Sequence, residues 1–433
     1  MLGPGCAPAD FDAISYINEP RWRSSRLGLE RIRELMDRLG NPQEKLRFVH
    51  VAGTNGKGST CAFVASILQE AGYKTGLFTS PYIVEFAERI RVNGRNIGEA
   101  DLRDITWNVR FQAMQMDDHP TEFELMTAVA LVYFEQMACD FVVLEVGLGG
   151  RLDSTNVIEA PCVCAIAPIA FDHTAVLGNS LRAIAAEKAG IIKSGALVVS
   201  AAQEPEAAEM LKAVCSEREC ALRFVDISAL SGTPQSFEYA GQHFAISLLG
   251  SYQTENAALA VEVIRALQSC GFDIEDAAIE RGLAKTSWPG RFELIAKNPC
   301  VIVDGGHNVQ GAQALISSLQ LNYPGKKAVF LLGVLEDKDY TAMIESLLGA
   351  AQAFVCIEPP NPRALHASDL AKAIMRSAAY RQDVPVICAD SIQEGLATAC
   401  SLAGKTGLVC ACGSLYSLAD VKGGAKAFGL TLP

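Results

Sequence analysis

The residues from Phe48 to Thr60 are of types, and in an order, that could hold a chain of phosphates. An apolar run ends at Ala52, a glycine-rich turn follows, and a helix-like pattern begins at about Lys57. Glycines let backbone N–H groups approach phosphate oxygens closely, and a helix N-terminus adds the positive end of its dipole. Lys57 would supply a point charge, while Ser59 or Thr60 would supply a hydroxyl for Mg²⁺. The predicted nucleotide-binding residues of this turn are Gly53, Thr54, Asn55, Gly56, Lys57, Gly58, Ser59 and Thr60.

The turn departs from the common G-x-x-x-x-G-K-[ST] pattern. Val51 stands where the first glycine would be, and Gly58 separates Lys57 from Ser59. A glycine-rich turn that only opens an ordinary helix is the alternative interpretation. The order of strand, turn, lysine and helix nevertheless favours a nucleotide site.

Three further side chains could act on a metal or a phosphate. Glu145 closes the apolar run Phe141–Leu144, and a carboxylate there is costly unless it is paired or bound to a cation. The carboxyl end of a parallel strand is where ligands bind, which favours a metal-binding Glu145. His173 by itself is better explained as a structural histidine. Lys188 by itself is better explained as a cation in the last turn of a helix over Ser180–Ala189.

Thr121-Glu-Phe-Glu124 fits a helix start, with Thr121 as the N-cap and Glu124 at the third position of a helix through Met137. This local structural role and a role in binding are about equally favoured by the residues. Arg291, taken alone, would be regarded as a surface charge.

Alternating strands and helices have to position these residues. Short apolar runs between turn signals predict buried strands in the first part of the chain, over Leu46–Ala52, Thr75–Thr79, Phe141–Val146, Cys162–Ile169 and Ala196–Ser200. Helix-like patterns such as Gly58–Ala71 lie between them. This alternation predicts a mostly parallel sheet that is covered on both faces.

The chain changes in texture over Ala221–Leu249, where short strand-like pieces carry Gly and Ser turns, and two helix-like stretches follow, Tyr252–Ser269 and Ile274–Lys285. The breakers at Thr286–Gly290 predict a linker. Strands are predicted again beyond it, over Cys300–Asp304, Lys327–Val334, Gln352–Ile357, Val384–Cys388 and Gly407–Cys412. At 433 residues the chain exceeds what one core usually serves. We predict an α/β protein with an N-terminal P-loop-type, mostly parallel sheet domain over residues 1–286 and a smaller, Rossmann-like α/β domain over residues 287–433.

Composition excludes several classes of partner. The formal net charge of −12 argues against nucleic acid or an anionic membrane, because both need a basic footprint. No apolar run reaches the length of a membrane span, and the first residues lack the basic start and apolar stretch of a signal peptide, so a cytoplasmic protein is expected. The 14 cysteines include no CxxC spacing, which predicts free thiols rather than a zinc cage or a redox pair.

Motifs across residues 50–416 resemble, in the same order, those of the folylpolyglutamate synthase and dihydrofolate synthase branch of the Mur ligase superfamily. The turn Gly53-Thr-Asn-Gly-Lys-Gly-Ser59 looks like the phosphate loop of that branch. The other similar motifs are Thr79-Ser-Pro-Tyr82, Glu88-Arg-Ile90, Leu144-Glu-Val-Gly-Leu-Gly-Gly-Arg-Leu-Asp153, Glu187-Lys-Ala-Gly190, Gly290-Arg-Phe292, Asp304-Gly-Gly-His-Asn308 and Gly413-Ser-Leu-Tyr416.

The resemblance implies roles that the patterns alone leave open. It implies metal binding by Ser59, Ser80, Glu145, His173 and Lys188. It also implies that Lys188 is carbamylated, which turns a cation into an oxygen donor suited to Mg²⁺. The catalytic residues implied are Lys57, Lys188 and His173. The further ATP-binding residues implied are Asn256, Arg291 and Asp304.

The same resemblance implies a pteridine pocket and an amino-acid side. The substrate-binding residues implied are Thr121, Glu122, Phe123, Glu124, Arg151, Leu152, Asp153, His307 and Ser414. Arg151-Leu-Asp153 is similar to the dihydropteroate-contacting segment of the bifunctional bacterial enzymes. Phe123 offers a flat surface on which a pterin could stack.

The expected activity is therefore that of an ATP-dependent ligase adding L-glutamate to dihydropteroate or to reduced folates through an acyl phosphate. Expected ligands are ATP, two Mg²⁺ ions, the folate-type substrate and L-glutamate, with no nucleic-acid or membrane partner and a monomeric state. Two alternatives are another Mur-type amino-acid ligase, such as one acting on a peptidoglycan precursor, and a P-loop nucleotide switch or motor.

Overall fold

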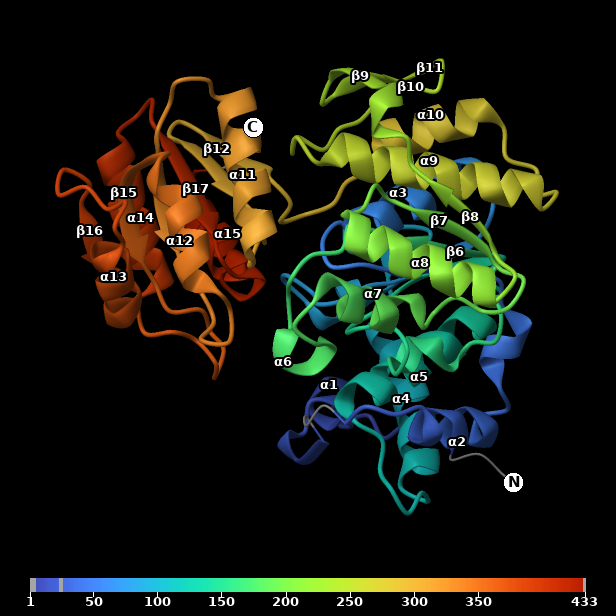
Figure 1. Cartoon of the computed structure of the whole chain (residues 1–433). Coiled ribbons are helices and arrows are strands. Elements are labelled where there is room, and N and C mark those ends of the chain that lie inside the picture. Colours follow the sequence, from blue (N-terminus) through green and yellow to red (C-terminus); the bar gives the residue numbers. More distant parts are fainter. Residues whose placement is uncertain (1–4, 23–25, 431–433) are drawn as a thin grey trace. The chain divides into compact units, whose positions relative to one another are not determined.

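Two compact units make up the chain (Figure 1). The computed structural model describes residues 5–22 and 26–430. Residues 1–4, which belong to the segment examined above for a signal peptide, lie outside the described residues. The first unit comprises the chain up to Ser231, Glu238–Ala245 and Glu255–Thr286. The second comprises Gly232–Phe237, Ile246–Thr254 and the chain from Ser287 onward.

The first unit is built on an eight-stranded sheet. Its strands, in spatial order, are β4 (Arg95–Asn96), β3 (Ile90–Val92), β2 (Thr75–Phe78), β5 (Phe141–Glu145), β1 (Phe48–Ala52), β6 (Val163–Ile166), β7 (Leu197–Ser200) and β8 (Ala221–Phe224). The pairs from β2 to β8 are parallel, and only β3 and β4 add in the antiparallel sense. The expected mostly parallel sheet is confirmed, and the antiparallel edge was not predicted.

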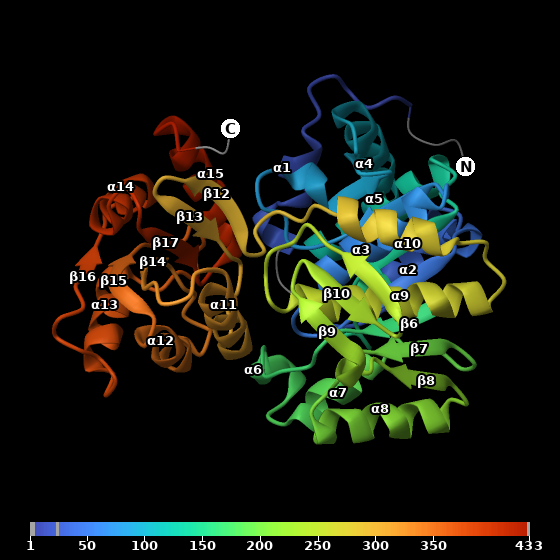
Figure 2. The ribbon, with the colours of Figure 1, turned by 90° about the horizontal axis from the view of Figure 1, so that it is seen from above.

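Helices cover this sheet on both faces (Figure 2). They are α1 (Ala13–Ile17), α2 (Glu30–Arg38), α3 (Lys57–Glu70), α4 (Glu99–Ala113), α5 (Glu122–Gln136), α6 (Thr174–Leu177), α7 (Leu181–Ala189), α8 (Pro205–Glu217), most of α9 (Gln253–Ser269) and α10 (Asp276–Lys285). Single 3₁₀ turns lie at Pro20–Trp22, Pro42–Lys45, Phe86–Arg89, Ser154–Val157 and Ile227–Ala229.

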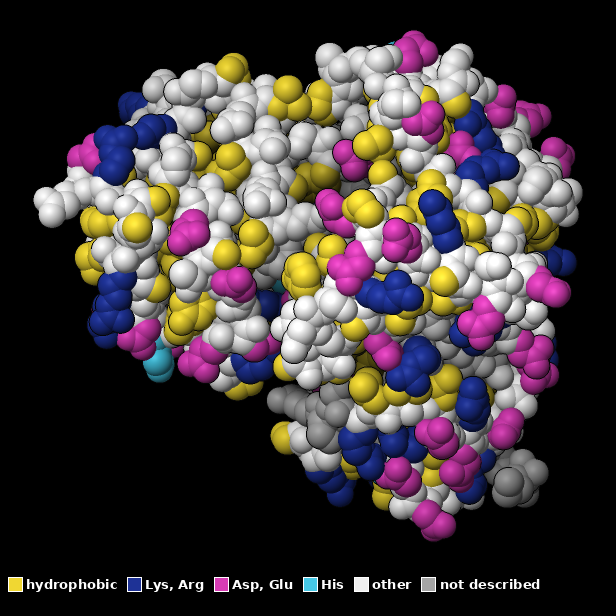
Figure 3. All heavy atoms as spheres, viewed as in Figure 1, with side chains coloured by type: hydrophobic (Ala, Val, Ile, Leu, Met, Phe, Trp, Pro, Cys, Tyr) yellow, Lys and Arg dark blue, Asp and Glu magenta, His cyan; other side chains and the backbone are white. Residues whose placement is uncertain are grey.

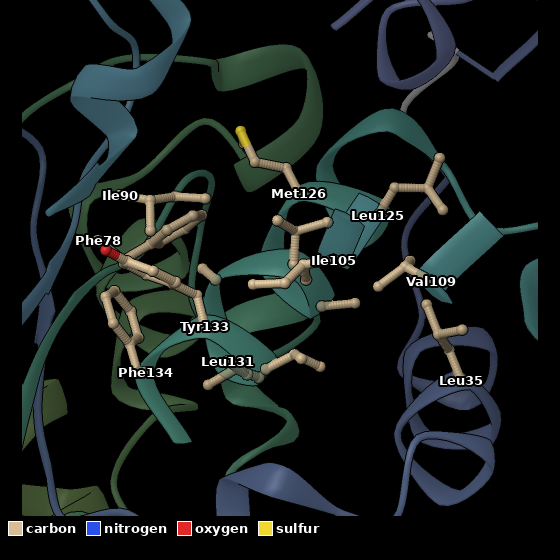
Figure 4. Close-up of a cluster of buried hydrophobic side chains, with 14 of the residues drawn as sticks. Leu35, Phe78, Ile90, Ile105, Val109, Leu125, Met126, Leu131, Tyr133 and Phe134 are labelled. Carbon is tan, nitrogen blue, oxygen red and sulfur yellow. The ribbon is translucent and has the colours of Figure 1, made fainter. Parts of the chain in front are cut away.

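Alternation along β5 shows how one strand serves two layers. Val142 and Leu144 are fully buried in the cluster formed with α4 and α5. Phe141 points to the opposite face, as the period of a strand requires, and its ring lies 4.8 Å from that of Phe272, beyond α9. Figure 4 shows the first of these layers, where Leu35 of α2 lies close to Val109 of α4.

A small three-stranded sheet accounts for the change in texture that follows β8, the last strand of the large sheet. Its order is β11 (Gln242–Ala245), β10 (Ser236–Tyr239) and β9 (Leu230–Thr233). Exposed and buried side chains alternate along β10, so Phe237 and Tyr239 face inward and Ser236 and Glu238 face solvent.

The second unit holds a six-stranded sheet. The order is β12 (Glu293–Lys297), β13 (Cys300–Val303), β17 (Leu408–Cys412), β14 (Ala328–Leu332), β15 (Ala351–Cys356) and β16 (Val386–Cys388). Its helices are α11 (Val309–Asn322), α12 (Tyr340–Leu348), α13 (Ala367–Arg376), α14 (Ile392–Ala403) and α15 (Leu418–Ala427), with a 3₁₀ turn at Leu415–Ser417. The edge strand β12 is antiparallel and was not predicted, because charged residues at both of its ends interrupt the apolar pattern.

No helix within residues 5–22 and 26–430 is both long and apolar enough to cross a membrane. Acidic and basic side chains are interspersed on the face shown in Figure 3, without a continuous basic tract. All 14 cysteines lie in the described part of the chain and are free, as predicted.

Candidate active site

The phosphate turn connects the central strand β1 to α3. The helix begins at Lys57, directly after Gly56, which adopts a left-handed conformation with φ of 83°. A side chain at position 56 would collide with the side-chain oxygen of Asn256, which is 3 % exposed. Glycine is therefore required at Gly56 by its backbone conformation and by the approach of Asn256.

The start of the turn is held against the segment that follows β6. The N–H of Thr54 donates to the carbonyl of Pro168 at 2.8 Å. The Thr54 hydroxyl donates to the carbonyl of Ala170 and accepts from its N–H, both at 3.0 Å. A Cβ at Gly53 would lie 2.7 Å from the Cβ of Ala167. The turn is thus fixed on one side before any ligand arrives.

Two lysines reach the same turn. Lys57 Nζ donates to the carbonyl of Thr54 at 3.1 Å, and Lys188 Nζ donates to the carbonyl of Gly53 at 2.7 Å. Lys188 is only 4 % exposed. Burial lowers the pKa of its amino group to about 7, and the neighbouring Lys57 charge acts in the same direction. Lys188 is therefore not the helix-end surface cation that its local pattern suggested.

Glu145 lies at the carboxyl end of β5, beside the end of β1. It pairs in register with Val51 and is 5 % exposed. Its Oε2 accepts the backbone N–H of Ser80 at 3.0 Å, which brings two predicted metal ligands together. Hydroxyl and carboxylate oxygens suit Mg²⁺, so Ser59, Ser80 and Glu145 fit that ion chemically.

The remaining predicted metal ligands fit less directly. In the described ranges no three or more His, Cys, Asp or Glu side chains gather as a metal-binding group. The His173 side chain is 37 % exposed, and its Nε2 lies 3.9 Å from Asp172 Oδ1. Lys188 could serve a metal only as an oxygen donor, because an ammonium group repels a cation. Thr60, 0 % exposed, is less accessible to a ligand than residues 54–57 of the loop, which are partly exposed.

Thr121-Glu-Phe-Glu124 forms the expected capping box at the start of α5. Glu124 Oε2 accepts the N–H and the hydroxyl of Thr121, at 2.7 and 2.9 Å. The Phe123 ring lies against Gly147, where a Cβ would come 2.8 Å from its Cε1, and 5.9 Å from the ring of Phe78. The aromatic surface of Phe123 is thereby held beside the loop that follows β5, and Glu122 is partly exposed at the same helix start.

Asp153 is occupied within its own loop. Its Oδ2 accepts the N–H of Leu148 at 2.8 Å, and its Oδ1 accepts the N–H and the hydroxyl of Thr155 at 3.0 and 2.5 Å. The residue is 5 % exposed, and burial raises the pKa of its carboxyl. Leu152 is partly buried. Asp153 therefore organises this loop, whatever it also contributes to a ligand.

Arg151 extends from the same loop toward α7. Its guanidinium donates to Glu187 Oε1 at 2.8 Å, and its backbone N–H donates to the Glu187 carbonyl, also at 2.8 Å. The Arg151 side chain is 54 % exposed. A charge this exposed is available to an anionic ligand.

In the second unit, Asp304, His307 and Ser414 lie in loops at the carboxyl ends of the parallel strands β13 and β17, and Arg291 lies just before β12. Asp304, 3 % exposed, follows β13 and accepts from the hydroxyl of Tyr252 at 2.9 Å, from the N–H of Phe292 at 2.8 Å and from the N–H of Gly306 at 2.7 Å. Burial raises the pKa of Tyr252 well above its usual value, and the Asp304 carboxylate adds to this. Arg291 lies against Gly305, where its guanidinium would clash with any Cβ.

His307 and Ser414 come from the loops after β13 and β17, which pair in parallel. The N–H of Gly413 donates to the carbonyl of Gly306 at 3.2 Å and joins the two loops. His307 Nδ1 lies 2.9 Å from the carbonyl of Gly305, and Ser414 Oγ accepts the N–H of Tyr416 at 3.3 Å. The second unit thus brings its own predicted residues to one edge of its sheet.

Sequence reasoning missed several residues of these sites. Asp172 lies beside His173, and its charge opposes the lowering of the Lys188 pKa. Its position just after a buried strand was a usable signal, as it was for Glu145. Arg31, which contacts Glu124, and His50, which contacts Thr155 just after the Arg151–Asp153 loop, carried no such signal.

Two domain families match the chain. The Mur ligase middle domain matches residues 51–264, and the Mur ligase glutamate ligase domain matches residues 290–415. Fold and phosphate turn agree with these matches. They define the class: an ATP-dependent ligase of the Mur type.

Individual relatives are more specific. The dihydrofolate synthase/folylpolyglutamate synthase of Bacillus subtilis (strain 168) is 38% identical over 428 residues, covering 95% of this chain and 98% of the relative. The structure of E. coli FolC in complex with DHPP and ADP aligns with a TM-score of 0.87 and 30% identity, covering 97% of this chain and 99% of that one. A bifunctional folylpolyglutamate synthase/dihydrofolate synthase with Mn, AMPPNP and L-glutamate bound aligns with a TM-score of 0.84 and 29% identity, covering 99% and 100%. This chain belongs to the dihydrofolate synthase/folylpolyglutamate synthase family.

Proposed function

We propose that this ligase joins L-glutamate to dihydropteroate and to reduced folates, with ATP as the energy source and an acyl phosphate as the intermediate. The observation that carries the proposal is the phosphate turn, with Lys57 and Lys188 both reaching its carbonyls. Family membership supports the choice of substrates.

The reaction has two steps. A carboxylate oxygen of the substrate attacks the γ-phosphorus of ATP, and ADP leaves, so that an acyl phosphate forms. The neutral amine of glutamate then attacks the acyl carbon, the amide bond forms, and phosphate and a proton leave. Lys57 stabilises negative charge on the transferring phosphoryl group, and the rigid turn positions it.

Mg²⁺ would be held by Ser59, Ser80 and Glu145, with His173 and Lys188 completing two sites. When bound, the ion neutralises phosphate charge and orients the phosphate oxygens. Lys188 joins this set after carbamylation: its neutral amine attacks CO₂, an N–C bond forms and a proton is lost. A pKa of about 7 supports this step, because much of the amine is then neutral at neutral pH.

Phe123 provides the stacking surface for a pterin ring, with Thr121, Glu122 and Glu124 around it. Arg151 is exposed enough to meet a substrate carboxylate, and Leu152 and Asp153 shape the loop between them. The Asp153 carboxylate, with three donors already, contributes mainly by holding this loop.

Residues 1–286 would form the ATP-binding domain and residues 287–433 the glutamate ligase domain. Asn256, beside the turn, and Arg291 and Asp304, in the second unit, are the remaining candidates for ATP. His307 and Ser414 are the candidates for glutamate, since they share one edge of a sheet. We also propose a monomer that acts in the cytoplasm; the formal net charge of −12 argues against a nucleic-acid or anionic-membrane partner.

Release of ADP tests this function. The purified protein is given ATP, Mg²⁺ and L-glutamate with dihydropteroate, with tetrahydrofolate, or with neither. We expect ADP release in step with amide product, and only when glutamate and a folate-type substrate are both present. ADP release that does not depend on glutamate would favour a nucleotide switch. Glutamate-dependent ADP release with tetrahydrofolate but not with dihydropteroate would refute the dihydropteroate activity and leave the ligase assignment intact.

A further inference from the structure

The predicted pterin-binding segment, Thr121–Glu124, and the residues just before it are contacted by a part of the chain that lies outside both matched domain families. We call residues 11–22 and 26–38 the N-terminal arm; the family matches begin only at residue 51. In the arm, α1 contacts α4 and α5, and α2 does the same. Figure 1 shows these four helices grouped in one part of the first unit. The general Mur fold therefore does not account for these contacts.

Aromatic side chains make the first set of contacts between the arm and this segment. The ring of Trp22 stacks on that of His119 at 4.2 Å, with an interplanar angle of 19°. His119 Nδ1 faces the carbonyl of Pro120 at 2.8 Å and so carries the proton. Its Nε2, 3.1 Å from the Tyr16 hydroxyl, is then the acceptor. These contacts fix the chain two residues before Thr121.

Charged groups make the second set of contacts. Arg31 Nε donates to Glu124 Oε2 at 3.0 Å, and the two side chains are only 11% and 4% exposed. The other nitrogens of Arg31 donate to Asp118 Oδ2 at 3.4 Å and to the carbonyl of Arg26 at 2.6 Å. One guanidinium thus joins the arm to both ends of the 118–124 segment.

Glu124 depends on this partner. Its Oε2 also accepts the two Thr121 donors, whereas its Oε1 is buried and has no hydrogen-bond partner among the described residues. A capping box needs a glutamate but no arginine, so Arg31 is an addition to the local motif. A buried carboxylate without a cation is strongly unfavourable, so loss of Arg31 would displace Glu124 and the helix start with it.

We propose that Arg31 is a positioning residue for the folate-type substrate: through Glu124 it sets where Thr121-Glu-Phe-Glu124 presents Phe123. The inference rests on the proposed function, because it assumes that a pterin binds against Phe123. Because the arm lies outside the matched families, it would adapt a general Mur ligase to this substrate class.

Steady-state kinetics of Arg31→Met, Arg31→Lys and Glu124→Gln test the proposal, with KM measured separately for the folate-type substrate, ATP and L-glutamate. Arg38→Met is the matched control, since Arg38 lies in the same helix and forms an (i, i+4) ion pair with Glu34 at the surface. We expect Arg31→Met to raise KM for the folate-type substrate about tenfold, with the other two KM values unchanged. Arg31→Lys should lie in between, and Arg38→Met should resemble the wild type.

A merely structural role would give a different result. It would lower the melting temperature and the fraction of active enzyme, and therefore the apparent kcat, while all three KM values stayed unchanged. Either this result or an equal rise in all three KM values would overturn the proposal. If Arg31→Met does not fold, Arg31→Lys and Glu124→Gln decide by the same KM comparison. Absence of glutamate-dependent ADP release in the wild type would instead contradict the proposed function itself.

Discussion

The phosphate turn and the predicted pterin-binding segments, Thr121–Glu124 and Arg151–Asp153, are built in opposite ways. The turn uses backbone groups and glycines close together in sequence, with Lys57 bonded to Thr54 three residues away. The predicted pterin-binding segments are held by side chains that are distant in sequence, such as Arg31, which lies 93 residues before its partner Glu124. The predicted site for a shared ligand is thus built locally, whereas the predicted site for a particular substrate depends on contacts from distant positions.

A second long-range contact holds the Arg151–Asp153 loop to the large sheet. His50 on β1 is fully buried, and its Nε2 lies 2.9 Å from the hydroxyl of Thr155. That hydroxyl has one proton and donates it to Asp153, so the histidine must be the donor. Burial lowers the pKa of His50 to about 3, which keeps the ring neutral. A chain of three side chains therefore anchors the Arg151–Asp153 loop to the central strand.

The largest expected effect is at the turn. Lys57→Ala should lower ADP release by about a thousandfold, because a cation that follows the phosphoryl group is lost. The melting temperature should stay close to that of the wild type, since Lys57 is partly exposed. Lys45→Ala, which removes a surface pair with Glu135, is the control. Turnover near the wild-type rate in Lys57→Ala would show that the turn is not the phosphate site.

Next in size is the effect of Lys188. Lys188→Ala should lose about a hundredfold in activity, as for removal of a group that supports a metal site, and short carboxylic acids should restore part of it. Because the pKa is about 7, the amine is mostly protonated at about pH 6 and mostly neutral at about pH 8. Activity of bicarbonate-depleted enzyme should therefore recover on adding bicarbonate at the higher pH and not at the lower one. Electron density that ends at a bare Lys188 amine in fully active enzyme would contradict carbamylation.

Much of the fold could be predicted, because each strand and helix signal is local. Most of the parallel strands carry apolar runs, as expected for strands that are buried on both faces. Thr121 and Ser180 cap their helices, a position that threonine and serine favour. The antiparallel strands β3, β4 and β12 were missed: β3 and β4 are only three and two residues long, and β12 has a charged residue at each end. Of the site, the turn and Glu145 were predictable from residue type and strand end, whereas Lys188 needed a family resemblance and Arg31 could not be found at all.

A moderate effect is expected from the anchoring chain. Thr155→Val should lower the free energy of unfolding by about 1–3 kcal/mol, because it leaves the Asp153 carboxylate and the His50 ring short of a buried partner. Thr155→Ser keeps the hydroxyl and should recover most of this loss. Chemical denaturation of both variants measures the difference. Equal free energies of unfolding for Thr155→Val and Thr155→Ser would mean that the Thr155 hydroxyl does not stabilise this loop.

The smallest effect on stability is expected from Arg151→Ala. Its pair with Glu187 is half-exposed, so the free energy of unfolding should change by no more than about 0.5 kcal/mol. If Arg151 also meets a substrate carboxylate, KM for the folate-type substrate should rise while the melting temperature holds. A change in stability without a change in KM would assign Arg151 to the loop alone.

The central claim is that the substrate carboxylate is activated by phosphorylation, and oxygen-18 tests it most directly. A folate-type substrate labelled with oxygen-18 in the reacting carboxylate is turned over with ATP and L-glutamate, and the phosphate is analysed by mass spectrometry. The account predicts one labelled oxygen in each phosphate released, because that oxygen bridges carbon and phosphorus in the acyl phosphate. Unlabelled phosphate, formed in step with the amide product, would contradict it.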